Sequence, residues 1–473
     1  MRKTVSRGYL KTFVFAGGLV AVALAPKFAQ ADNISDAMIG AYKTSGLLEQ
    51  NRALLRATDE NVAIAVAKLR PVINWTLSAQ QSYSRVNTGS AISKSNSEGL
   101  STGINLQWLL FDGGASQLNQ LAAQETVLST RQSLLNIEQQ VLFSAVQAYV
   151  NVLLQQDTVS LRGNNLRLLQ EELKAAQDRF EVGEVTRTDV ALAQSRVAAA
   201  QASLTESRGD LLTAQAVYIE VVGHSSGGLA GQPNLPQRAT SLQSAQSIAV
   251  RNHPSLLAQQ HAVKAADLTA KSVAKSLGPS VSFEAAASYT DFWGGSSEGR
   301  NTSNTSLTLS QPIYAGGALA ASSRASVARL DAEKGALISV QRSVAQVVSQ
   351  AYVVLETSRA SLVSSNERVR AAQVAFDGIR EEATLGARTT LDVLQSEQEL
   401  LDAQTSRVQA RANQVIAAFG LLSSQGLLTA EHLGLGVEIY DPTLYYNLVK
   451  DAPAHVSQRS KDLDRVMKAL GKN

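Results

Sequence analysis

The chain has 473 residues and a formal net charge of +3. Its first 31 residues hold five Lys or Arg and no Asp or Glu, so the remainder carries a charge of −2 and nucleic acid is not expected as a partner. The absence of cysteine excludes disulfides, thiolate metal sites and a cysteine nucleophile.

The chain begins with the pattern of a secretory signal peptide. Basic residues from Arg2 to Lys11 precede an apolar stretch, 13–24, and the triplet Ala29-Gln30-Ala31 follows as a cleavage site. We therefore predict a signal peptide over residues 1–31. Beyond it, no stretch reaches the ~18 apolar residues of a membrane helix, so any membrane crossing is expected to use strands.

The rest of the chain repeats itself. The segment 108–114 (WLLFDGG) returns as 312–317 (PIYAGG), with Gly113 matching Gly316 at an offset of 203 residues. We predict a first repeat over 32–222, a Gly-, Ser- and Pro-rich linker over 223–240, and a second repeat over 241–428. The remaining tail, 429–473, is predicted to be partly disordered.

Each repeat is expected to hold a strand pair with one apolar and one polar face. Ile73, Trp75 and Leu77 alternate with polar residues, and the same alternation recurs around Val281 and Phe283. Pro71 and Pro279 stand where a helix should end and a strand begin. The polar segments 85–99 and 294–303 are predicted to be surface loops between the paired strands.

Long helices are expected to follow each strand pair. Apolar residues recur every seven positions from Ala145 to Phe180 and from Val190 to Tyr218, and again from Val348 to Phe376 and from Leu394 to Leu422. Sustained heptads predict coiled-coil packing. A helix from about residue 115 to 182 would extend ~100 Å at ~1.5 Å per residue.

Four two-faced strands cannot close a barrel alone, because closure requires roughly eight or more strands. Two, three or four chains would therefore have to combine. The alternative is a non-channel coiled-coil spacer of the cell envelope, for which apolar strand faces have no use. An enzyme is the weakest hypothesis, since the chain has no nucleotide-binding or hydrolase motif, its five histidines lack metal-ligand spacing, and no cofactor is expected.

The most specific signal is a pair of matching turns, 182–190 (VGEVTRTDV) and 385–393 (LGARTTLDV), each between heptad helices. With them, nearly all of the chain after the signal resembles the TolC-like outer membrane efflux family. The resemblance implies an α+β membrane protein: a homotrimer whose four strands per chain form one transmembrane β-barrel in outer-membrane lipid, continuous with a periplasmic α-helical coiled-coil barrel. It also implies a passive exit duct for drugs or secreted polypeptides, served by a periplasmic adaptor and an inner-membrane transporter.

The resemblance also assigns roles to residues at the turns. Arg388 matches the tip arginine of the family, Thr188 and Asp189 match its bonding partners, and Asp392 matches the first constriction aspartate; Gln395 occupies the place of the second. The residues expected to meet the adaptor are Gly183, Glu184, Val185, Thr186, Gly386, Ala387 and Thr389. A competing explanation for the acidic residues is helix capping, because Thr186 and Asp189, like Thr389 and Asp392, have capping-box spacing.

Overall fold

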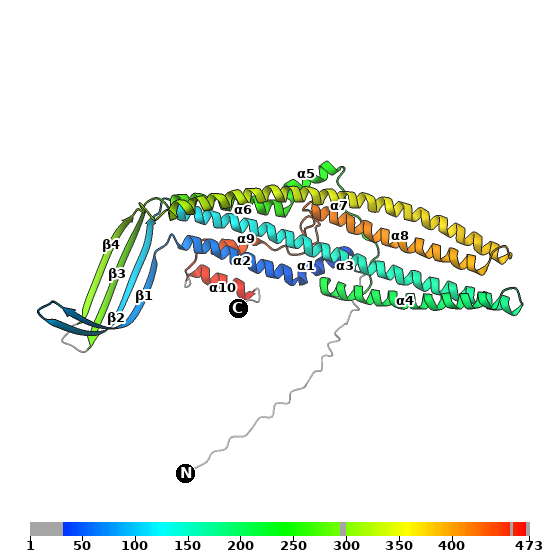
Figure 1. The fold of residues 1–473 in the computed structure, drawn as a ribbon, viewed down its shortest axis with the longest axis horizontal. Coiled ribbons are helices and arrows are strands. Elements are labelled where there is room, and N and C mark those ends of the chain that lie inside the picture. Colours follow the sequence, from blue (N-terminus) through cyan, green and yellow to red (C-terminus); the bar gives the residue numbers. More distant parts are fainter. Residues whose placement is uncertain (1–31, 294–298, 455–456, 470–473) are drawn as a thin grey trace, which may run out of the picture.

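The computed structural model describes residues 32–293, 299–454 and 457–469. The protein is elongated, with an antiparallel sheet at one end and two long helical hairpins that run to the other end (Figure 1). In chain order the elements are α1 (Ile34–Thr44), α2 (Gly46–Ala67), β1 (Val72–Asn87), β2 (Ile92–Phe111), α3 (Ala115–Glu181), α4 (Arg187–Val222), α5 (Leu242–Asn252), α6 (Pro254–Lys275), β3 (Ser280–Trp293), β4 (Arg300–Ser310), α7 (Ala318–Thr384), α8 (Thr390–Ser424), α9 (Pro442–Val449) and α10 (Gln458–Ala469).

The internal duplication is visible in the bounds of the elements. The helices α3 and α7 both have 67 residues and begin 203 positions apart, and each follows a glycine with positive φ, Gly114 or Gly317. The 22-residue helices α2 and α6 begin 208 positions apart. The two repeats therefore share one order of elements, and their length difference falls in the sheet.

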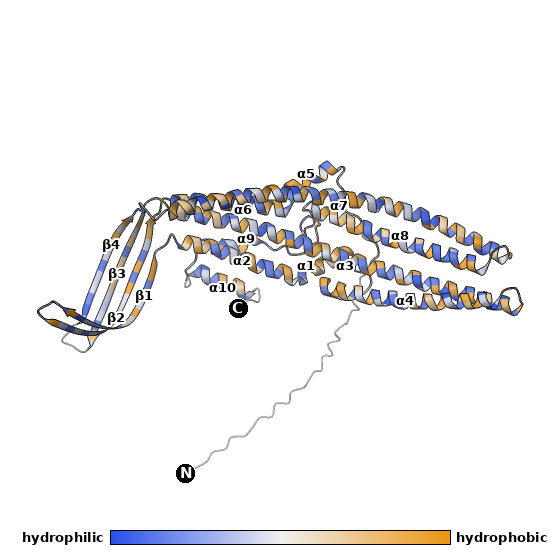
Figure 2. Ribbon diagram, viewed as in Figure 1, coloured by the Kyte–Doolittle hydropathy of each residue, from blue (hydrophilic) through white to orange (hydrophobic). Residues whose placement is uncertain are grey.

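The four strands form one antiparallel sheet in the order β1-β2-β3-β4. Polar and apolar residues are interspersed along the strands (Figure 2). Directly opposed residues share a face, and in the half of the sheet nearer the helices one face is apolar across all four strands. Its members include Ile73, Trp75 and Leu77 of β1, Ile104, Leu106 and Trp108 of β2, Val281 and Phe283 of β3, and Leu307 and Leu309 of β4. In the single chain this face is open, with Trp75 67% and Leu309 70% exposed.

One predicted loop is largely strand. The segment 85–99 was expected to be a surface loop, but β1 continues to Asn87 and β2 begins at Ile92. The turn is tight because the Asn87 side chain accepts a hydrogen bond from the N–H of Gly89 (3.0 Å), whose φ of +79° suits glycine. The matching segment 294–303 lies partly outside the described residues, and its last part, from Arg300, belongs to β4.

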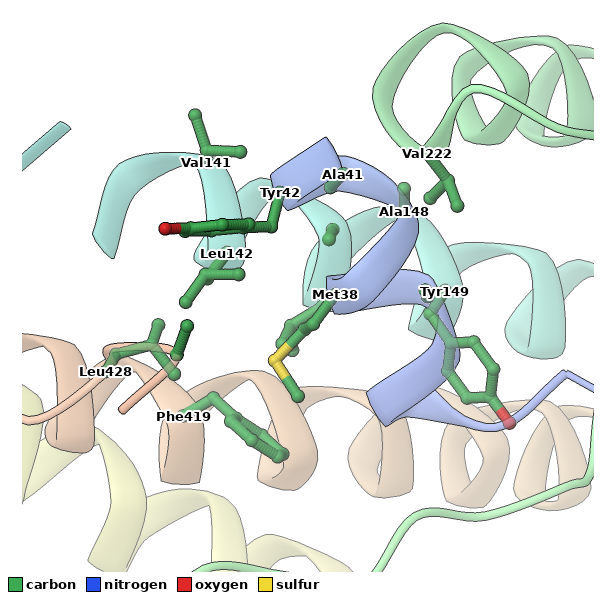
Figure 3. Close-up of a cluster of buried hydrophobic side chains, with 14 of the residues drawn as sticks. Met38, Ala41, Tyr42, Val141, Leu142, Ala148, Tyr149, Val222, Phe419 and Leu428 are labelled. Atoms are coloured by element: carbon green, nitrogen blue, oxygen red, sulfur yellow. The ribbon is translucent and has the colours of Figure 1, made fainter. Parts of the chain in front are cut away.

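Two separate cores hold the helices together midway along the molecule. In the larger core, Met38 and Tyr42 of α1 pack on Leu142 of α3, with Phe419 of α8 and Leu428 beside them (Figure 3). The second core places Ala245 and Ala249 of α5 against α7 and α8. Most of the predicted heptad positions are buried, although Phe180, at the end of its series, is 44% exposed.

The tail, which we expected to be partly disordered, packs on the first repeat over much of its length. Ala430 donates its N–H to the buried Glu138 carboxylate (2.7 Å), and Leu435 and Val449 are buried. The Arg52 guanidinium lies between the rings of Tyr42 and Tyr440, 5.1 and 5.2 Å from their centroids. These contacts join residues far apart in the sequence, and no local pattern reveals them.

None of the helices within the described ranges is both long and apolar enough to cross a lipid bilayer.

Candidate functional site

The two turns between the long helices share one backbone geometry. Gly183 and Gly386 both adopt left-handed φ values, +79° and +77°, at the ends of α3 and α7. The bonding is that of a Schellman motif, in which the last carbonyls of a helix accept from the residues just beyond it. Its hydrogen bonds are Gly183 N–H to Phe180 O (3.0 Å), Glu184 N–H to Arg179 O (2.9 Å), Gly386 N–H to Ala383 O (3.1 Å) and Ala387 N–H to Glu382 O (2.9 Å).

Each turn then opens a new helix through a capping box. The Thr186 backbone N–H and hydroxyl both donate to Asp189 Oδ2 (2.9 and 2.7 Å), and Thr389 bonds Asp392 in the same way (2.9 and 2.8 Å). Bonds to Thr186 hold the pKa of Asp189 below its usual value, and bonds to Thr389 do the same for Asp392. Both carboxylates therefore act as helix caps, as the competing explanation required.

Arg388 forms an ion pair inside its own turn. Its Nε donates to Glu382 Oε2 (2.8 Å), which raises the pKa of the arginine further. Within one chain the structure therefore does not bring Arg388 to Thr188 or Asp189, the partners implied by the resemblance. Thr188 is exposed on the first turn of α4, and Gln395 is exposed on the second turn of α8. A bond between Arg388 and Asp189 stays a prediction about assembled chains.

The residues expected to meet an adaptor lie on the surface of the turns. Gly183, Glu184, Thr186, Gly386, Ala387 and Thr389 are exposed, and Val185 is half-buried. Two neighbouring residues that were not predicted from the sequence are apolar and exposed to solvent: Val182 is 71% exposed and Leu385 is 79% exposed. They occupy matching positions, 203 residues apart, so the duplication itself was the signal that could have found them.

A contact band joins the two hairpins a short distance behind the turns. Leu394 of α8 is buried in a small apolar cluster with leucines of α3 and α4, and Leu168 of α3 packs against a second cluster formed by α7 and α8. Beside these leucines the Asn165 amide donates to Glu397 Oε1, and Arg380 forms an ion pair with Glu172 (3.2 Å). We refer to these six residues as the hairpin bridge. Sequence reasoning missed it because its members belong to different repeats.

Glu397 has the most unusual environment in the hairpin bridge. Its side chain and that of Asn165 are both buried, with exposures of 6% and 9%. Burial raises the pKa of Glu397 to about 7, the Glu172 carboxylate adds to this, and the bond from Asn165 and the charge of Arg196 oppose it. A group of this kind changes charge near neutral pH.

Comparison with known proteins gives consistent matches along the chain. The family model for outer membrane efflux proteins matches residues 41–224 and 245–427. Outer membrane efflux protein BepC of Brucella suis biovar 1 (strain 1330) is 36% identical over 455 residues, covering 95% of this chain and 98% of the relative. Outer membrane protein TolC of Escherichia coli (strain K12) is 26% identical over 426 residues, covering 85% and 84%.

Solved structures share the fold. The crystal structure of the outer membrane protein VceC from Vibrio cholerae superposes with a TM-score of 0.71, covering 83% of this chain and 96% of its own. Its sequence identity is 16%, so this likeness concerns the fold alone.

Proposed function

This chain belongs to the outer membrane efflux protein family, and from that membership we propose that three copies of it form one channel across the outer membrane. The resemblance inferred from the duplicated turns is thereby confirmed. The family consists of transport channels, which disfavours both an enzyme and a non-channel spacer.

The observation that carries this proposal is the sheet with one open apolar face and two free edges. β1 and β4 are the outer strands of the four, so in a single chain each leaves a row of backbone groups unpaired on one side. In hydrocarbon such edges must be closed. Three copies would pair β4 of one chain with β1 of the next, closing a barrel with the apolar face toward lipid and the polar face toward water.

The helices extend this duct away from the membrane. Each chain contributes two hairpins whose longer helices span ~100 Å at ~1.5 Å per residue. In the trimer we expect them to form a periplasmic tunnel whose narrow end lies at the turns. The exposed Val182 and Leu385 beside the turn glycines offer an apolar contact for the adaptor. The duct is passive, and an inner-membrane transporter selects the cargo, either small molecules or polypeptides, and supplies the energy.

Native mass spectrometry of the detergent-purified protein tests the assembly, and conductance in planar bilayers tests the duct. We expect three copies per particle and discrete ion-conducting channels. A folded monomer that conducts no ions would overturn the proposal.

A further inference from the structure

The hairpin bridge is the last connection between the two hairpins before the turns. Glu172 lies nine residues before the end of α3, ~14 Å along the helix axis, and Asn165 lies ~24 Å from that end. Closer to the turns, no hydrogen bond or ion pair joins the two hairpins among the described residues. The two turns can therefore move apart only if the contacts of the hairpin bridge break or the helices bend.

The bridge contains an acid that is costly to ionise where it lies. The polar and charged groups that act on Glu397 come from two other helices: Asn165 and Glu172 from α3, and Arg196 from α4. Arg380 is engaged by Glu172, and Asn165 supplies the hydrogen bond that Glu397 receives. An ionised Glu397 would thus be a buried charge with a neutral amide as its direct partner.

We propose that the Glu397–Asn165 contact is a proton-dependent lock, which holds the two hairpins together while Glu397 is protonated and lets the turns part when it ionises. This inference rests on the proposed function, because the same turns form the periplasmic end of the duct. The lock acts within each chain, and it would hold the turns closed in addition to any contact between neighbouring chains.

The direction of the pH effect follows from the raised pKa. When the hairpins part and Glu397 meets water, its pKa returns toward 4.5, whereas in the bridge it is about 7. The bridged form binds the proton more tightly than the parted form. Protonation of Glu397 therefore stabilises the bridged form fully below pH 4.5, and this stabilisation is lost as the pH rises to about 7. Above about pH 7 the equilibrium between bridged and parted hairpins no longer depends on Glu397.

Distances between spin labels in the two hairpins test the lock. The chain has no cysteine, so Gln177→Cys on α3 and Ala375→Cys on α7, both exposed positions, can be labelled uniquely. Trimers that contain one labelled chain report the distance within that chain. Between pH 5 and pH 8 we expect the population of longer distances to rise by about tenfold or more, since each unit of pKa shift is a tenfold change in ratio.

Three variants separate the lock from a general effect of pH. Glu397→Gln replaces the acid with an uncharged amide of similar size and should abolish the pH response. Glu399→Gln, an exposed acid two residues further along α8, should leave it unchanged. Asn165→Ala should show the longer distance already at pH 5. A wild-type distance that ignores pH, or a Glu397→Gln variant that responds like wild type, would overturn the lock.

Conductance of the same preparations distinguishes this inference from the duct itself. Circular dichroism and native mass spectrometry confirm that each variant is folded and assembled. A pH-dependent distance in particles that conduct no ions would refute the duct and support the lock. Conducting channels in which the distance does not change with pH would support the duct and refute the lock.

Discussion

The charged residues at the turns use most of their bonding capacity within their own helix ends. Asp189 and Asp392 cap α4 and α8, and Arg388 pairs with Glu382. All of these side chains are reached by solvent, where ion pairs are weakened by screening. If Arg388 instead bonded Asp189 of another chain, it would exchange one exposed partner for another. The net gain in free energy per copy would therefore be small.

Replacing Arg388 by Ser tests whether that exchange takes place. If Arg388 latches neighbouring chains, the variant should raise the open fraction of single channels while the trimer stays intact, because the cation of the latch is lost. Glu382→Gln is the matched control, since it keeps the cation and removes only the partner within the turn. Wild-type conductance in both variants would show that Arg388 serves its own helix end alone.

Among the elements, the tail contributes more than its sequence suggests. It covers Glu138 and buries Leu435 and Val449, each worth about 1.5–3 kcal/mol when fully removed from water. Arg70 also donates to the carbonyl oxygens of Ala452 (2.6 Å) and Asp451 (2.5 Å), which joins the segment after α9 to the segment before β1. The tail is therefore expected to support the junction between helices and sheet.

Removing residues 429–473 should lower the Tm in detergent, because it exposes the partners of Leu435 and Val449 and leaves Glu138 without its backbone donor. Removing only 458–473 takes away α10, whose main contact with another described element is with α9, and should change the Tm little. Thermal unfolding followed by circular dichroism measures both. Equal Tm values for the two truncations would contradict a structural role of the 429–452 segment.

In the molecule as a whole, the β1–β2 turn and the helical turns lie at opposite ends (Figure 1). If the sheet forms the barrel, the β1–β2 turn must face the exterior and the helical turns the periplasm. A membrane-impermeant maleimide should label Ser93→Cys in intact cells and should reach Glu184→Cys only after the outer membrane is permeabilised. The cysteine-free wild type is the control, and labelling of Glu184→Cys alone in intact cells would invert the orientation.

The features that sequence alone predicted are local or periodic. The duplicated turns, the glycines at 183 and 386, the heptads and the alternating strands each arise from residues within a few turns or a few strand positions of one another. Their backbone preferences act before any distant contact forms. The helix limits at 115–181 therefore agree with the predicted arm of about 115–182, and the second arm, 318–384, starts 203 positions later.

Contacts between distant segments were decided only by the tertiary structure. Asn165 and Glu397 are 232 positions apart and look like ordinary heptad-helix residues, and Ala430 meets Glu138 across 292 positions. The Arg388–Glu382 pair shows that sequence fails to identify partners even at short range, because several acidic residues near the turn could have paired with Arg388. Which side chains meet depends on how the two hairpins and the tail pack in three dimensions, because periodicity specifies the buried face of a helix but not the partner that covers it.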